Sequence, residues 1–155
     1  LVVGKTKRRT VAVENLVVGP GKNSLVKGEV VEAITLPQRP AKSGDAYLRF
    51  IPRTEMDIAV VGVAVSLSCK RGIVESARVS LGAVAPTALL VKKAADAIIG
   101  TKLEPEALEN LAAACSAACN PIDDKRGTID YRVRVAGVLA RRAAKIAFER
   151  AGGKI

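Results

Sequence analysis

The chain has 155 residues, about the length of one domain, and 49% of them are hydrophobic although only 3% are aromatic, so aliphatic side chains must fill its core. Lysine and arginine outnumber aspartate and glutamate by 25 to 15, a net charge of +10, which favours acidic partners such as nucleic acid, anionic lipid, nucleotide phosphate or an acidic subunit. Two Tyr, two Phe and no Trp leave little for base stacking, so nucleic acid is not expected among them. The absence of histidine excludes histidine-based triads, histidine general bases and the usual mixed zinc sites.

The chain opens with an irregular, basic segment, residues 1–28. Its turn-rich part, VGPGKNS, resembles a phosphate-binding P-loop, but Leu16 stands where the motif requires its first glycine and Asn23 where it requires a hydroxyl. A basic surface turn is therefore the better interpretation. A strand-like run at 29–37 and a connection at 38–45 follow. Because the chain begins within an apolar run and not at a methionine, we expect a fragment of a longer polypeptide.

Three strands are predicted in the middle of the chain. Apolar and polar residues alternate at 47–52 and again at 73–84, the period of a strand with one buried face. The run at 58–69 is rich in valine and contains a glycine, so it favours a strand over a helix. Gly72 can form the turn between the second and third of these strands, which predicts a hairpin.

Helices are predicted in the last part of the chain, where the period of the apolar residues changes to that of a helix. Capping, proline and glycine signals delimit them at residues 87–99, 105–119 and 128–150. Thr87 is the expected N-cap of the first helix, and Thr128 or Asp130 lies near the start of the last. Strands followed by helices predict an α+β domain, an antiparallel sheet of about three to four strands with the three helices packed on one face.

The cysteines give no sign of a disulfide framework or a metal site. Cys69, Cys115 and Cys119 are odd in number, and free thiols in a reducing cytoplasm are the simplest interpretation. Cys115 and Cys119 share one face of a predicted helix, but their neighbours are small and apolar, so we expect buried core thiols. The sequence shows no secretory signal and no apolar run of about 18 residues that would predict a transmembrane segment.

The last predicted helix carries six basic residues: Arg132, Arg134, Arg141, Arg142, Lys145 and Arg150. Three of them, Arg134, Arg141 and Lys145, share one face of the helix. This face is either solvated or a surface for a partner, and the pattern leaves both open. The carboxylates of Asp123 and Asp124 precede the helix, where they suit its dipole, and we do not interpret them as an acid/base pair.

A compact charged patch lies between two apolar runs and contains Arg49, Arg53, Glu55 and Asp57. One interpretation is a surface corner whose charges compensate each other. The other is a site in which carboxylates hold guanidinium groups and present them to an anionic or carbonyl-rich ligand. The charge pattern by itself does not decide between the two.

Four sequence blocks, in this order, resemble a known family. They are YLRFIPRTEMDIAVVGVAV at 47–65, RVSLGAVAPT at 78–87, PIDDKRGTIDYR at 121–132 and VLARRA at 138–143. Together they resemble the C-terminal domain of the flavoprotein (medium) subunit of molybdenum hydroxylases, a family that includes xanthine dehydrogenase. The match is best to the branch of aerobic carbon monoxide dehydrogenase. The stretch RTVAVENLVVGPGKNSLVKGE at 9–29 is similar to the end of the FAD-binding domain that precedes it in this family.

The resemblance implies a division into residues 1–40, the end of an upstream FAD-binding domain with its connection, and residues 41–155, the C-terminal domain. It implies part of an oxidoreductase, in which the domain completes the FAD pocket and docks to the molybdenum and iron–sulfur subunits that deliver electrons to FAD. Substrate chemistry then belongs to the molybdenum cofactor of a partner subunit. The glycine-rich loops that hold the FAD pyrophosphate lie upstream in the family, so this chain alone is not expected to bind FAD tightly or to be active.

The resemblance also assigns roles within the charged patch. Arg49 matches a basic position that faces the carbonyl edge of the flavin, where a cation stabilises negative charge on the reduced ring. Arg53 and Asp57 are expected to shape the loop beside it. The rival hypothesis is a stand-alone basic module that binds nucleic acid or an acidic protein, and a third is a structural domain without flavin contact.

Overall fold

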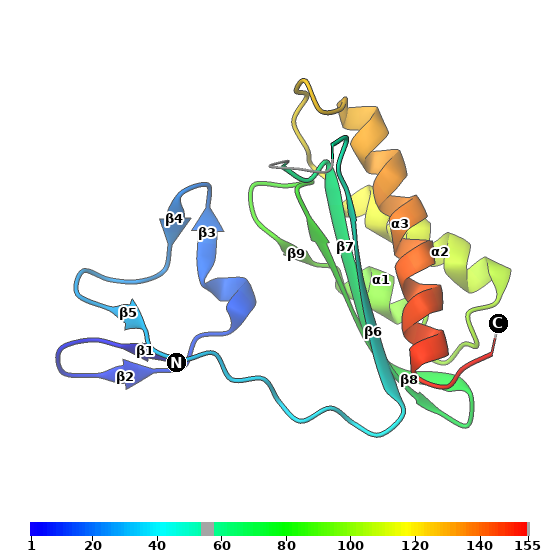
Figure 1. Ribbon diagram of the computed structural model, residues 1–155, viewed down its shortest axis with the longest axis horizontal. Coiled ribbons are helices and arrows are strands. Elements are labelled where there is room, and N and C mark those ends of the chain that lie inside the picture. The colour runs from blue at the N-terminus through cyan, green and yellow to red at the C-terminus, as the bar shows by residue number, and fades with distance from the viewer. Residues whose placement is uncertain (54–57, 155) are drawn as a thin grey trace. The chain divides into compact units, whose positions relative to one another are not determined.

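The chain forms two compact units, Leu1–Arg39 and Pro40–Ile155. The computed structural model describes residues 1–53 and 58–154 (Figure 1). Each unit has its own hydrogen-bonded sheets.

The first unit consists of very short antiparallel strands. Its sheets have the orders β2-β1-β5 and β3-β4. The bounds are β1 Val2–Val3, β2 Arg8–Arg9, β3 Val17–Gly19, β4 Lys22–Asn23 and β5 Val30–Val31, with a 3-10 turn at Val13–Asn15. The predicted strand at 29–37 is wrong beyond Val31: Glu32 and Ala33 still form hydrogen bonds with Leu1, but residues 32–37 belong to no strand. Gly21 in the β3–β4 turn has a φ of 67°, so the P-loop-like segment is a hairpin turn, as expected.

The second unit is built on a four-stranded antiparallel sheet of order β6-β7-β8-β9. Its strands are β6 Ser43–Phe50, β7 Val61–Lys70, β8 Ile73–Gly82 and β9 Leu89–Leu90. The predicted hairpin is confirmed: Arg71 and Gly72 form its two-residue turn, with φ angles of 52° and 77°, the left-handed pair that suits the twist of a hairpin.

Three helices cover one side of this sheet: α1 Lys92–Asp96, α2 Pro105–Ala118 and α3 Ile129–Arg150. The long helix α3 packs across β6 and β7, α1 packs against β8, and α2 packs against α3 and α1 (Figure 1). The α+β prediction is therefore confirmed. Thr128 is the N-cap of α3, because its side chain accepts a hydrogen bond from the Tyr131 N–H at 3.2 Å.

The predicted start of the first helix is wrong. Thr87 caps no helix, because Leu89 and Leu90 form β9 and pair with Leu81 and Ser80 of β8. The Val91 N–H donates to the Val79 carbonyl, and α1 begins only after Val91. The apolar run therefore extends the sheet before the chain turns into a helix.

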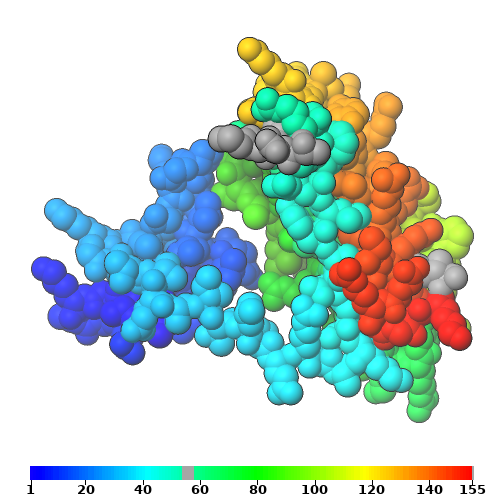
Figure 2. Space-filling view, in the orientation of Figure 1, coloured from blue at the N-terminus to red at the C-terminus, as the bar shows by residue number. Residues whose placement is uncertain are grey.

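Helix α3 packs closely on the sheet because its buried face is made of small residues. Its fully buried side chains are mainly alanines: Ala136, Ala140, Ala143, Ala144 and Ala147. A Cβ on Gly44 of β6 would lie 2.0 Å from the Ala147 carbonyl oxygen. The end of α3 and the start of β6 meet at this point (Figure 2), and Arg150 donates a hydrogen bond of 2.6 Å to the Asp45 carbonyl there.

Candidate functional site

The first candidate site is on the face of the four-stranded sheet that points away from the helices. Alternate residues of a strand point to opposite faces, and Leu48 and Phe50 pack on the core side. Arg49 therefore lies on the opposite face, where its side chain is exposed. Strand β6 thus directs one predicted site residue outward and holds it by pairing with β7.

The surface next to Arg49 is flat because glycines occupy the paired positions. Arg49 pairs with Gly62 of β7, and Gly62 pairs with Gly82 of β8. A Cβ on Gly82 would meet nothing within 4 Å, whereas a Cβ on Gly62 would lie 2.9 Å from the Tyr47 hydroxyl oxygen. The Tyr47 ring thus covers this glycine strip at Gly62, and the strip is open at Gly82.

The other predicted site residues lie in the connection between β6 and β7. Arg53 is exposed and follows β6. Asp57, together with Glu55, lies outside the described residues, so its predicted role stays a prediction. The described ends of the connection are joined by a 2.9 Å hydrogen bond from the Val60 N–H to the Phe50 carbonyl.

Arg132, one of the six basic residues of the last predicted helix, is a site residue for which no role was predicted. Only 3% of it is exposed. Its guanidinium donates to the carbonyls of Val60 at 2.7 Å and Ala83 at 3.3 Å, and it forms a 2.7 Å ion pair with Asp124. One signal was readable: Arg132 precedes Ala136 by one turn and so lies on the apolar face of α3.

The two carboxylates before α3, Asp123 and Asp124, form different interactions. Asp123 accepts a hydrogen bond from the Ile129 N–H at the first turn of α3, which agrees with the dipole interpretation. Asp124 instead faces basic groups: it accepts from the Arg126 N–H at 2.8 Å and pairs with Arg132. The Arg126 N–H, followed by the Arg132 guanidinium, lowers the pKa of Asp124 below its usual value. Asp124 is thus the counter-ion of a buried arginine.

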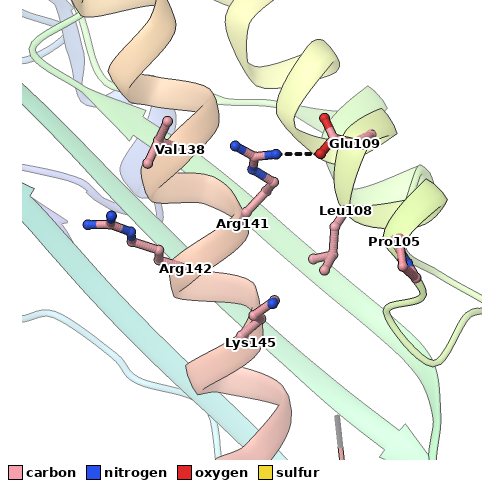
Figure 3. A pocket seen from close by; sticks show the side chains of 7 residues that line it. All are labelled: Pro105, Leu108, Glu109, Val138, Arg141, Arg142 and Lys145. Atoms are coloured by element: carbon pink, nitrogen blue, oxygen red, sulfur yellow. Dashed lines mark hydrogen bonds and ion pairs between the residues drawn. The ribbon is translucent and has the colours of Figure 1, made fainter.

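A second candidate site is a basic groove between α2 and α3 with a volume of about 360 Å³. Its lining residues are Pro105, Leu108, Glu109, Val138, Arg141, Arg142 and Lys145 (Figure 3). Arg141 pairs with Glu109 across the groove, while Arg142 and Lys145 are exposed on its α3 side. Of the predicted basic face, Arg141 and Lys145 therefore line the groove and Arg134 does not. The groove combines an apolar floor with an excess of positive charge.

The cysteines are free thiols, with Cys69 and Cys115 buried and Cys119 half-buried. Cys115 is completely buried, so the prediction of a core thiol is confirmed for it, and this burial raises its pKa to about 12. Among the residues that the structure describes, no group of three or more metal-ligating side chains is placed to hold an ion. None of the helices in the described ranges is long and apolar enough to cross a membrane.

Comparison with known proteins now decides the family. The family model described as CO dehydrogenase flavoprotein C-terminal domain matches residues 46–147. The chain belongs to this family. The resemblance inferred from the four sequence blocks is therefore confirmed.

Known proteins are similar to this chain over most of its length. The carbon monoxide dehydrogenase medium chain of Afipia carboxidovorans is 33% identical over 150 residues, which are 97% of this chain and 52% of that protein. The nicotine 6-hydroxylase medium subunit of Paenarthrobacter nicotinovorans is 31% identical over 87% of this chain and 47% of that subunit. A structure of reconstituted CO dehydrogenase from Oligotropha carboxidovorans matches with a TM-score of 0.92 at 33% identity. The match covers 96% of this chain and 52% of the chain in that structure. The chain spans about half the length of the curated relatives it matches.

Proposed function

We propose that this chain is the C-terminal part of the FAD-binding medium subunit of a molybdenum hydroxylase, an oxidoreductase of the carbon monoxide dehydrogenase and xanthine dehydrogenase type. In it the chain completes the FAD pocket and docks to subunits that carry the molybdenum cofactor and iron–sulfur clusters, from which electrons reach FAD. The names of the relatives, medium chains and an FAD-binding subunit, support this proposal. With its free thiols, the assembly is proposed to work in the cytoplasm.

The observation that carries the proposal is the exposed Arg49 at the end of the glycine strip formed by Gly62 and Gly82, which is open at Gly82. A planar ring system can approach a sheet face closely where side chains are small. A guanidinium at the edge of such a strip is suited to donate hydrogen bonds to carbonyl oxygens. The residues present therefore fit the carbonyl edge of a flavin ring that is held elsewhere.

In this arrangement Arg49 would bind and orient the flavin ring and stabilise negative charge on it. FAD, when bound, supplies the electron-accepting chemistry. Arg53, with Asp57, would shape the rim next to Arg49. The chain's own contribution is a fixed positive charge at the ring edge.

The first unit fits the end of an upstream FAD-binding domain, and we propose that assignment for residues 1–40, with residues 41–155 as the C-terminal domain. Its apolar side chains are largely exposed: Val13 and Ile34 at 74% and Leu36 at 85%. Such a dense set of exposed apolar side chains indicates a surface that another part of the protein covers.

The test compares Arg49→Ala with Arg78→Ala in the complete, FAD-loaded subunit. Arg78 lies on the same outer face, because it pairs with Ser66 of β7, four residues along from the partner of Arg49. A hydrogen bond to a charged group contributes roughly 1.5–3 kcal/mol. Its loss from the reduced state should lower the two-electron potential of the flavin by about 30–60 mV.

Arg78→Ala should leave the potential and the affinity for FAD within error. If Arg49→Ala also leaves both unchanged, the assigned role of Arg49 is wrong.

A second candidate function is a stand-alone basic module for an acidic protein or nucleic acid, favoured by the groove with Arg141, Arg142 and Lys145. Binding of the chain to polyanions at several salt concentrations distinguishes the two functions. The stand-alone module would be supported if the logarithm of the affinity fell steeply with the logarithm of the salt concentration. The double variant Arg142→Glu, Lys145→Glu should then lose this salt-dependent binding. A flat dependence would support subunit docking at specific contacts instead.

A further inference from the structure

We infer that Arg132 is a positioning residue: it fixes the ends of the β6–β7 connection and thereby sets where Arg49 and Arg53 are presented. The flavin part of this inference rests on the proposed function. The mechanical part, that Arg132 holds the end of the sheet in place, rests on the contacts of the described residues alone.

Val60 is the point at which Arg132 acts. The Val60 N–H donates to the Phe50 carbonyl and so joins the two ends of the connection. The Val60 carbonyl accepts a 2.7 Å hydrogen bond from Arg132 Nη1. Val60 is completely buried, so water cannot replace the Arg132 guanidinium as the donor to its carbonyl. Loss of the guanidinium would therefore leave a buried carbonyl without this hydrogen bond.

The same guanidinium also holds the end of β8. Nη1 of Arg132 lies 3.3 Å from the Ala83 carbonyl oxygen, and Ala83 adopts a φ of 63°. A left-handed conformation costs a non-glycine residue about 1 kcal/mol or more, and it persists only where the surroundings enforce it. Since Gly82 directly precedes Ala83 and Gly62 follows Val60 by two residues, Arg132 anchors the backbone on either side of the strip beside Arg49.

Two neighbouring residues, Asp124 and Tyr131, support the position of Arg132 at the ends of the connection. Asp124 neutralises the guanidinium at 2.7 Å, which a buried arginine requires. The Tyr131 ring packs edge-to-face on Phe50, with centroids 6.0 Å apart. The first turn of α3 therefore contacts both ends of the β6–β7 connection, Phe50 through Tyr131 and Val60 through Arg132.

Lysine cannot replace this arginine. The planar guanidinium has five N–H donors in a fixed fork, whereas an ammonium is a single compact charge. In Arg132 the fork reaches Asp124 from Nη2 while Nη1 reaches Val60. Arg132→Lys keeps the charge, but its single ammonium would stay with the oppositely charged Asp124 and lose the contact to the Val60 carbonyl.

The test measures amide hydrogen exchange in the complete, FAD-loaded subunit with valine-selective isotope labelling. In Arg132→Lys the Val60 amide should exchange roughly tenfold faster or more, because opening of the Val60–Phe50 hydrogen bond no longer breaks a charge-assisted contact. The Val74 amide, which donates to the Thr101 carbonyl near the β7–β8 turn, should keep its rate.

Arg126→Gln is the matched control, since Arg126 also pairs with Asp124, while the contacts to Val60 and Ala83 described above come from Arg132. It should leave the Val60 amide unchanged. Equal acceleration of the Val60 and Val74 amides in Arg132→Lys would mean a merely global loss of stability and would overturn the inference, as would no acceleration.

The flavin potential separates this inference from the proposed function. Arg132→Lys should lower the potential in the same direction as Arg49→Ala, and by a smaller amount in a background that already carries Arg49→Ala. If Arg49→Ala shifts the potential while Arg132→Lys changes neither the potential nor the Val60 amide, the positioning role is wrong. If Arg132→Lys accelerates only the Val60 amide and neither variant shifts the potential, the mechanical role stands and the proposed flavin contact fails.

Discussion

The two units of this chain are stabilised by different kinds of contact. Pro40–Ile155 has one continuous apolar core, formed by the valines of β7 and β8, the alanines of α3 and side chains such as Phe148 and Leu111. Leu1–Arg39 has strands of only two or three residues. It contains a two-pronged ion pair, in which Arg9 donates two 2.8 Å hydrogen bonds to Glu29.

The difference shows which unit has the means to be stable by itself. Burial of apolar area is the main stabilising contribution in a domain of this size, whereas exposed ion pairs contribute little. The second unit should therefore keep its structure alone, while the first unit, whose valines and leucines are largely exposed, depends on polar contacts. Three predictions break or sharpen this contrast.

The largest effect is expected from Gly44→Ala in the second unit. The new Cβ would lie 2.0 Å from the Ala147 carbonyl oxygen and 2.7 Å from the Ala151 nitrogen, both backbone atoms that cannot swing away. Either α3 or β6 must shift, at a cost of about 3 kcal/mol or more. Urea denaturation followed by helical circular dichroism measures this, because all the α-helices described lie in the second unit.

Gly82→Ala is the control for this prediction, because its Cβ would meet nothing within 4 Å on the same sheet. Its stability should change by no more than about 0.5 kcal/mol. Equal denaturation midpoints for Gly44→Ala and the unmodified chain would show that α3 does not press on β6 as closely as described.

A smaller and more local effect is expected from acid. Arg9, followed by the Val26 N–H, lowers the pKa of Glu29 to about 2. A carboxyl group whose pKa is lowered by folding stabilises the folded state above its unfolded pKa, about 4.5, and this stabilisation disappears as the pH falls toward 2. The first unit should therefore loosen over that range before the second unit unfolds.

Limited digestion by an acid-active protease, read out by mass spectrometry, follows this loosening within Leu1–Arg39. In Glu29→Gln the first unit should be digested readily at every pH, without the acid-dependent step. Glu32→Gln, which removes the ion pair of Arg8 with Glu32 on the surface, should change little. Loosening of both units at the same pH would contradict the contrast between them.

The smallest effect concerns the thiols of the second unit. Burial raises the pKa of Cys115 to about 12 and also raises the pKa values of Cys69 and Cys119. Only Cys119 is partly exposed, so a thiol reagent at neutral pH should label Cys119 slowly and the other two only after unfolding. Cys119→Ser should abolish labelling of the folded chain, and persistent labelling would show that the core opens more readily than its packing indicates.

Much of the second unit could be predicted from the sequence because its signals are local. The β7–β8 turn needs a glycine with a positive φ, and Gly72 is at the required position. Pro105 and Thr128 mark the starts of α2 and α3 because a proline suits the first helical turn and a threonine side chain caps it. The alternation at 47–52 predicted the strand that the structure shows as the end of β6.

The features that the sequence could not predict depend on residues far apart in the chain. Leu89 and Leu90 join the sheet because β8 offers a free edge, which no local signal reveals. The acceptors of Arg132 lie 72 and 49 positions away, at Val60 and Ala83. A long cationic side chain on a helix looks like a surface residue, and only the fold shows that these carbonyls surround it.

The most direct test of the central claim is an experimental structure of the complete subunit with FAD bound. The Arg49 guanidinium is expected to lie about 3 Å from a carbonyl oxygen of the flavin ring, with the ring edge over the open part of the strip at Gly82. A ring held entirely by other domains, with Arg49 beyond hydrogen-bonding reach of every flavin atom, would contradict it.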